Sequence, residues 1–213
     1  VANAVAGANC PAPRTYFAHY YKRYLQFMDE PAITSNDIVM LGNSLTEGGG
    51  DWGKRLGKDN IINRGISGDV AMGIYDRLHQ ILPGKPKQIF LLIGVNDISH
   101  DLSTDSIVQM IEKNVTRIQR ESPETKLYLQ SLLPIDESFN RYKKLTNKTY
   151  QIPEINDRLK ALAKEKKIDF IDLYPLFTEK GTNVLRKELT YDGLHLKEEG
   201  YKIWVDAIKK KIK

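Results

Sequence analysis

Short apolar runs alternate with amphipathic segments along most of the chain. The strongest run, "QIFLLIGV", is apolar on both faces, as the central strands of parallel sheets are. It occupies residues 88–95 and predicts a buried strand. Four further apolar runs predict strands at 38–41, 60–63, 126–134 and 168–173. The pattern therefore predicts five short strands.

Helices are predicted between these strands. In each amphipathic segment, apolar residues recur at steps of three and four, so that one stripe of a helix faces a core. The segments with this spacing are 15–29, 104–121, 152–166 and about 197–212. Strands that alternate with helices indicate βαβ units, which form a parallel sheet with helices on both faces. We therefore expect an α/β fold in which the C-terminal strand ends share one edge, where open α/β sheets bind ligands.

The chain has 213 residues, which is enough for one domain with a substantial core. We expect residues 36–213 to form this domain and residues 1–35 to add an extension and a helix packed on it. One connection, 134–151, is long and carries Phe139 and Tyr142. Loops of this length in compact domains are more often functional than idle.

The net charge of +5 adds little to this picture, because the lysines are scattered. The one dense run, Lys209–Lys211 with Lys213, is typical of the solvated end of a last helix, and we expect no nucleic-acid partner. No stretch approaches the roughly 20 apolar residues of a membrane span. Cys10 is the only cysteine, which excludes an intrachain disulfide and disfavours a cysteine-based metal site.

The first ten residues, "VANAVAGANC", begin without Met and are rich in small side chains. They resemble the region around the cleavage point of a secretory signal. Export to the periplasm or the extracellular space, with the signal removed, is our hypothesis for localisation. A shortened cytoplasmic chain is the alternative.

Polar residues cluster in four turns along this pattern. Ser44 lies in "GNSLTEGG", Gly68 in "NRGISGD" and Asn96 in "GVND", each after a predicted strand. Asp192 and His195 lie in "YDGLHL", just before the last helix. Each turn alone has an ordinary explanation, such as a glycine turn, a braced loop or a surface Asp–His pair.

Ser44 shows this ambiguity most clearly. It could cap the next helix, with Glu47 three residues later completing a capping box. A serine nucleophile would instead need a base, an acid that orients the base, and donors for the oxyanion. Asp192 and His195 offer the acid and the base. No metal site is expected, because no second histidine or cysteine lies in a recognisable ligand motif.

The four turns, in this order, resemble the SGNH/GDSL hydrolase superfamily from about residue 36 to the end. The resemblance implies a three-layer α/β/α fold like flavodoxin, with a five-stranded parallel sheet. It implies a serine esterase without metal or cofactor, in which Ser44, His195 and Asp192 form the catalytic triad. Gly68 and Asn96, together with the N–H of Ser44, would form the oxyanion hole.

Two positions depart from the common family pattern. Asn43 stands where aspartate usually precedes the serine, and we interpret it as a variation in how the turn is braced. Val70 stands where threonine is common, which removes a hydroxyl but leaves the donor at Gly68 in place.

The motifs are most similar to those of acetylhydrolase-like and carbohydrate O-acetylesterase members. We therefore expect a small-molecule or glycan ester substrate, with acetate removed from a sugar hydroxyl. Trp52, Phe139 and Tyr142 could stack on the sugar, although ordinary packing of loops on the domain is the somewhat better explanation for each of them taken singly. Two alternatives remain open, a lysophospholipase or thioesterase for longer acyl chains and an inactive carbohydrate-binding domain.

Overall fold

The computed structural model describes residues 14–213. Cys10 and the segment on which the export hypothesis rests lie outside the described residues. That hypothesis stays a prediction.

Five parallel strands form a single sheet, as predicted. Their order across the sheet is β2-β1-β3-β4-β5. The bounds are Ile38–Gly42 for β1, Ile61–Gly65 for β2, Gln88–Leu92 for β3, Lys126–Gln130 for β4 and Asp169–Ile171 for β5. All residues of β1 and β3 are buried, which explains why these strands read as unbroken apolar runs.

Two strands end earlier than their apolar runs do. The run 88–95 leaves the ladder after Leu92, and the run 126–134 leaves it after Gln130. The residues beyond are still apolar because they pack in the core, as Ile93 and Leu133 do at 1% and 4% exposure. An apolar run thus reports burial, while hydrogen bonding sets the end of a strand.

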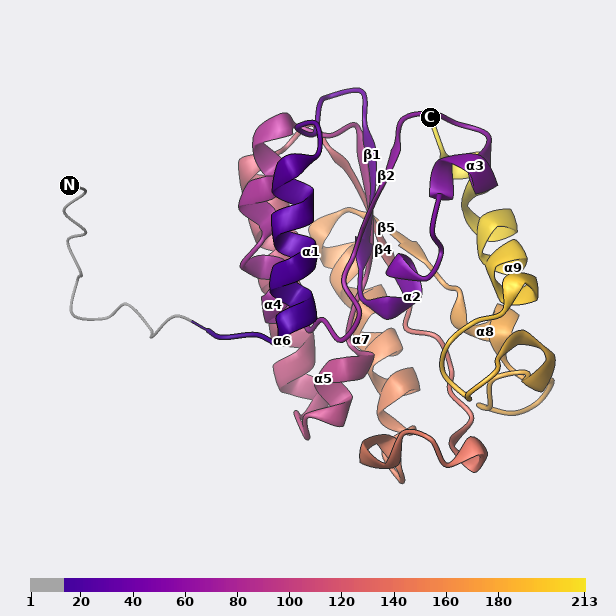
Figure 1. Cartoon of the computed structure of the whole chain (residues 1–213). Helices are drawn as coiled ribbons and strands as arrows, with labels where there is room; N and C mark the ends of the chain where they lie inside the picture. Colours follow the sequence, from indigo (N-terminus) through magenta and orange to yellow (C-terminus); the bar gives the residue numbers. More distant parts are fainter. Residues whose placement is uncertain (1–13) are drawn as a thin grey trace, which may run out of the picture.

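Helices cover both faces of the sheet, which confirms the predicted three-layer α/β fold (Figure 1). On one side lie α1 (Ala18–Asp29), α4 (Ala71–Tyr75), α6 (Thr104–Glu121) and α7 (Gln151–Lys166). On the other lie α3 (Trp52–Leu56), α8 (Tyr174–Phe177) and α9 (Glu198–Ile208). The short helices α2 (Ser44–Glu47) and α5 (Val95–Ser99) follow β1 and β3 directly.

The long helix α6 shows how the sequence specifies these layers. Its buried stripe includes Ile107, Ile111, Val115 and Ile118, at the predicted spacing. The hydroxyl of Ser103 accepts the N–H of Ser106 at 3.1 Å and caps the first turn. The helix therefore begins where the capping residue stands and faces the core along its apolar stripe.

The topology opens a crevice at one edge of the sheet. β1 pairs with β2 on one side and with β3 on the other, so the chain reverses its direction of winding at β1. The segments that follow β1 and β3 consequently diverge at their C-terminal ends, where open α/β sheets bind ligands. Ser44 follows β1, Gly68 follows β2 and Asn96 follows β3.

Helix α1 reaches this edge of the sheet. Its buried residues Tyr20 and Phe27 form a small hydrophobic cluster with Ile66, which lies in the turn after β2. The helix thus packs against the turn that carries Gly68. None of the helices within residues 14–213 combines the length and apolar character needed to cross a membrane.

Candidate active site

The turn after β1 presents Ser44 at the start of α2. Asn43 caps this helix, because its Oδ1 accepts the N–H of Leu45 at 3.0 Å. This geometry confirms the interpretation of Asn43 as a turn brace, and it leaves the Ser44 hydroxyl free of a capping role. Gly42 is required for the tight turn, since a Cβ there would lie 2.3 Å from Thr46 Oγ1 and 2.6 Å from the Leu92 carbonyl oxygen.

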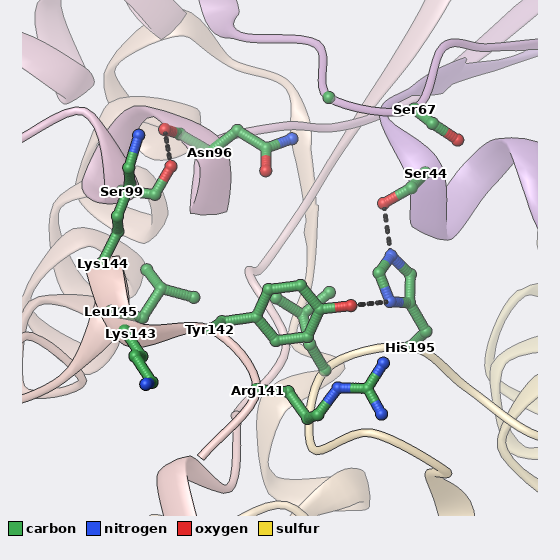
Figure 2. A pocket seen from close by; sticks show the side chains of 12 residues that line it. Ser44, Ser67, Asn96, Ser99, Arg141, Tyr142, Lys143, Lys144, Leu145 and His195 are labelled. Carbon is green, nitrogen blue, oxygen red and sulfur yellow. Dashed lines mark hydrogen bonds between the residues drawn. The ribbon is translucent and has the colours of Figure 1, made fainter. Parts of the chain in front are cut away.

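His195 lies between Ser44 and Asp192 and contacts both. Its Nε2 is 2.9 Å from Ser44 Oγ, and its Nδ1 is 2.7 Å from Asp192 Oδ2. Figure 2 shows the imidazole pointing directly at the serine hydroxyl. The structure thus brings together three residues that the sequence separates by up to 151 positions.

Asp192 is held as a carboxylate by its surroundings. Burial raises the pKa of this carboxyl, but hydrogen bonds from Tyr142, from the His195 side chain and from two backbone N–H groups outweigh that effect. The pKa falls to about 2 as a result. The backbone donors are the N–H groups of Leu194 and His195, at 2.9 and 2.7 Å from Oδ1.

Tyr142 takes a position that the sequence did not predict. Its hydroxyl donates to Asp192 Oδ2 at 2.6 Å and lies 2.9 Å from His195 Nδ1. The side chain also lines the cavity in front of Ser44, where a stacking residue was expected. Tyr142 therefore contacts both the Asp–His pair and the space for substrate.

The other two aromatic residues lie away from the cavity. The expectation that Trp52 contacts substrate is wrong, because its side chain is only 1% exposed. It packs at 5.0 Å and 70° against the ring of Trp204, and its Nε1 donates to the Thr46 carbonyl at 2.9 Å. Phe139 is half-buried beside Gly193 and is not among the residues that line the cavity.

The three candidate oxyanion donors belong to Ser44, Gly68 and Asn96, which all line the same cavity. Gly68 has φ +85°, a conformation that favours glycine, and no acceptor within residues 14–213 pairs with its N–H. The N–H of Ser44 is the first of α2 and has no intrahelical partner. Asn96 donates one amide hydrogen to the Asp69 carbonyl at 2.9 Å, which leaves the second for the cavity.

A network of side chains fixes the turn that carries Gly68. Ser67 donates to Glu47 at 2.5 Å, and this carboxylate also pairs with His19 at 2.8 Å and Arg23 at 2.9 Å. The ring of Phe17 covers Gly68 so closely that a Cβ there would come within 2.8 Å of it. Sequence reasoning missed these contacts, because Glu47 had been considered only as part of a capping box.

Two buried carboxylates, those of Asp69 and Asp97, hold the segments that follow β1 and β2 in place. Asp69 pairs with Arg77 at 2.9 Å, and that guanidinium also donates to the Gly42 carbonyl at 3.1 Å. Asp97 accepts the N–H of Ala71 at 3.2 Å, as expected of a residue that braces the turn. Burial raises the pKa of Asp97 to about 7, with a further contribution from the charge of Asp69.

The cavity in front of Ser44 has a volume of about 670 Å³. Ser44, His195 and Asn96 form one part of its wall, and the loop 141–145 forms another (Figure 2). This loop belongs to the long connection singled out in the sequence. It contributes Arg141, Lys143, Lys144 and Leu145 besides Tyr142, and none of these four was predicted.

Comparison with known proteins agrees with this geometry. The sequence profile of the GDSL-like lipase/acylhydrolase family matches residues 40–203. The chain belongs to this family. The match extends from β1 to α9 and therefore includes all four turns of the candidate site.

Relatives of this GDSL-family protein are distant in sequence. A GDSL-like lipase from Bacteroides thetaiotaomicron has 26% identity and a TM-score of 0.79, with 92% of this chain and 98% of that chain covered. An acetyl xylan esterase has 22% identity and a TM-score of 0.68, with 83% and 100% covered, which shows a shared fold.

An N-acylneuraminate cytidylyltransferase from Escherichia coli is 25% identical over 182 residues. That alignment covers 84% of this chain but only 41% of the bacterial protein, so the chain spans less than half the length of this relative. The family match gives the reaction class: this GDSL-family protein is a carboxylester hydrolase.

Proposed function

We propose that this esterase removes short acyl groups, acetate above all, from carbohydrate hydroxyls through an acyl-enzyme on Ser44. The observation that carries the proposal is the continuous hydrogen-bonded path from Ser44 Oγ through His195 to Asp192. The candidate donors at Ser44, Gly68 and Asn96 support it, because these residues line the same cavity. This is the arrangement that acyl transfer to a serine requires.

In the proposed mechanism, Ser44 Oγ attacks the ester carbonyl carbon while its proton passes to His195 Nε2. Asp192 stabilises the imidazolium that forms. The carbonyl oxygen becomes an oxyanion, which the N–H groups of Ser44 and Gly68 and the Asn96 amide stabilise.

The intermediate then collapses. The bond between the carbonyl carbon and the alcohol oxygen breaks, and His195 returns the proton to the leaving alcohol. A water molecule, activated by His195, attacks the acyl-enzyme in the same way. Collapse of this second intermediate releases the carboxylic acid, and His195 returns the proton to the serine oxygen.

Leu145 and Leu194 supply aliphatic side chains to the wall of the cavity, and most of the surface that this wall exposes is apolar, although most of its residues are polar or charged. An acetyl group needs only a small apolar contact, whereas a long acyl chain needs an extended one, because its burial supplies the binding free energy. The structural neighbour that is an acetyl xylan esterase shares the fold and is consistent with this proposal.

Chain-length specificity tests the proposal. We expect the protein to hydrolyse p-nitrophenyl acetate with a higher kcat/KM than the butyrate, and the butyrate with a higher value than the octanoate. Ser44→Ala should lower kcat/KM for all three by a factor of about 10³ or more. Ser106→Ala, which changes an exposed serine on α6, is the matched control and should keep the wild-type values.

Each alternative function gives a different result. Preference for octanoate over acetate would favour a lysophospholipase or thioesterase and contradict the deacetylase proposal. The absence of hydrolysis that depends on Ser44, in a protein that still binds acetylated sugars, would favour an inactive carbohydrate-binding domain.

A further inference from the structure

Three cationic side chains line the cavity in front of Ser44. They are Arg141, Lys143 and Lys144, all from one stretch of five residues in the long connection. No aspartate or glutamate is among the described residues that form this wall. Figure 2 shows Arg141 and Lys144 on either side of Tyr142.

These cations lack partners within the described chain. No carboxylate of residues 14–213 forms an ion pair with any of the three, whereas Lys148 on the same loop pairs with Asp101. Arg141 also borders a small neighbouring cavity that Asp136 and Glu137 line, so it is the least isolated of the three. The charge of Lys144 also acts on Asp101, whose pKa is lowered by Lys148 and, to a smaller extent, by Lys144. Lys143 is therefore the least compensated of the three cations.

A cluster of three cations in a cavity favours the binding of an anionic ligand. Like charges placed within a few residues repel one another, and a bound anion offsets that repulsion. A concave surface lined by one sign of charge also concentrates ligands of opposite charge, because the field is focused in the cavity. The planar guanidinium of Arg141 can hold a carboxylate through two parallel hydrogen bonds, as it can a phosphate.

The position of the charge within the substrate follows from the proposed reaction. An acetyl group is too small to carry a charged substituent, so the negative group must lie on the alcohol part of the ester. We infer that the natural substrate is an O-acetylated acidic carbohydrate, with a sugar carboxylate near the acylated hydroxyl. This inference rests on the proposed esterase function and specifies its leaving group.

A matched pair of polymers tests it. O-Acetylated polygalacturonic acid carries a carboxylate on each sugar, and its fully methyl-esterified form has the same backbone without that charge. We expect kcat/KM for acetate release to be about 10-fold higher for the acidic polymer at an ionic strength of about 0.01 M, and nearly equal for both at about 0.5 M. Equal values at low ionic strength, or preference for the neutral polymer, would overturn the inference.

Variants assign the effect to the loop. Lys143→Gln combined with Lys144→Gln should reduce the preference for the acidic polymer to about twofold or less. The control, Lys160→Gln combined with Lys164→Gln, changes two exposed lysines of α7 and removes the same total charge. It should keep the preference; loss in both double variants would attribute the effect to net charge and overturn the inference.

The neutral substrate p-nitrophenyl acetate separates this inference from the proposed function. If the protein hydrolyses it in a manner that depends on Ser44 but shows no preference for the acidic polymer, only the inferred substrate class fails. If it hydrolyses neither p-nitrophenyl acetate nor the polymers, the proposed function fails, and the inference fails with it.

Discussion

The hydroxyl of Tyr142 adds a fourth group to the Ser–His–Asp arrangement. It donates to the same Asp192 oxygen that faces His195 Nδ1, so it holds the carboxylate in the orientation that the imidazole needs. The hydrogen bond also helps to lower the pKa of Asp192, since the phenol stabilises the ionised carboxylate.

Tyr142→Phe removes this hydrogen bond and keeps the ring. Because hydrogen bonds to charged groups contribute about 1.5–3 kcal/mol, we expect kcat/KM for p-nitrophenyl acetate to fall by about 10-fold. The melting temperature should fall by no more than about 10 °C, since the ring stays in place and the side chain is 38% exposed. Tyr150→Phe, at a 60% exposed position, is the control. An unchanged or higher kcat/KM would show that the hydroxyl does not position Asp192.

Asn96 tests the oxyanion hole at the same scale. Asn96 lines the cavity and donates one amide hydrogen to the Asp69 carbonyl, and its second amide hydrogen pairs with no acceptor of residues 14–213. Asn96→Ala should lower kcat by about 100-fold or more with little change in KM, because the donor acts mainly on the transition state. Asn183→Ala, on the exposed surface, should have no effect. A loss below about fivefold in a folded variant would argue against this donor.

At the scale of elements, α1 packs against the turn after β2, and side-chain contacts connect the two. The Phe17 ring at the start of α1 covers Gly68, and Glu47 ties Ser67 to His19 and Arg23. The helix that precedes the matched family region thus supports a residue of the proposed oxyanion hole.

Phe17→Ala should therefore lower activity without unfolding the protein. The ring is 42% exposed, so its loss removes little core packing, but the turn becomes free to shift and misplace the Gly68 donor. We expect kcat/KM to fall by about fivefold. Leu25→Ala, a 59% exposed position in α1, is the control and should behave like the wild type. If both variants behave alike, α1 does not support the turn.

The strands and long helices were predictable because local patterns encode them. The run 38–41 is apolar because β1 is buried on both faces, and the stripe in 104–121 is the face that α6 buries. The short helices α3 and α4 were missed, because five residues give too few periods to reveal a pattern. The ends of β3 and β4 were misjudged because the apolar runs continue into buried loops.

At the scale of the whole molecule, the buried carboxyl of Asp97 links stability to pH. Its pKa is about 7 in the folded protein, against 3.8 for the ordinary group. The folded state therefore retains a proton at pH values where the unfolded chain has lost it. Stability from this group is fully present below about pH 4 and is lost as the pH rises through about 7.

Asp97→Asn should flatten this dependence. The amide oxygen can still accept the Ala71 N–H, and it carries no charge to bury. We expect the free energy of unfolding, measured by urea titration, to fall more between pH 4 and pH 8 in the wild type than in the variant, by on the order of 2 kcal/mol. Equal slopes for the two proteins would show that Asp97 does not titrate in this range.

The site itself was only partly predictable from the sequence. The motifs in their turns predicted Ser44, Asp192 and His195 as the triad. The fold brings these residues within hydrogen-bonding distance of one another. Trp52 was misjudged because its partner Trp204 is far away in the sequence. The hydroxyl contact of Tyr142 with Asp192 was missed for the same reason, since tertiary contacts leave no local signal.

Covalent labelling tests most directly whether Ser44 is the nucleophile. Ser44, Ser67 and Ser99 all line the cavity, but only Ser44 contacts His195. After reaction with a fluorophosphonate, peptide mass spectrometry should find one modification, on Ser44, and none on the other two serines. Labelling of Ser67 or Ser99 instead, or no labelling in a protein that hydrolyses p-nitrophenyl acetate, would contradict the account.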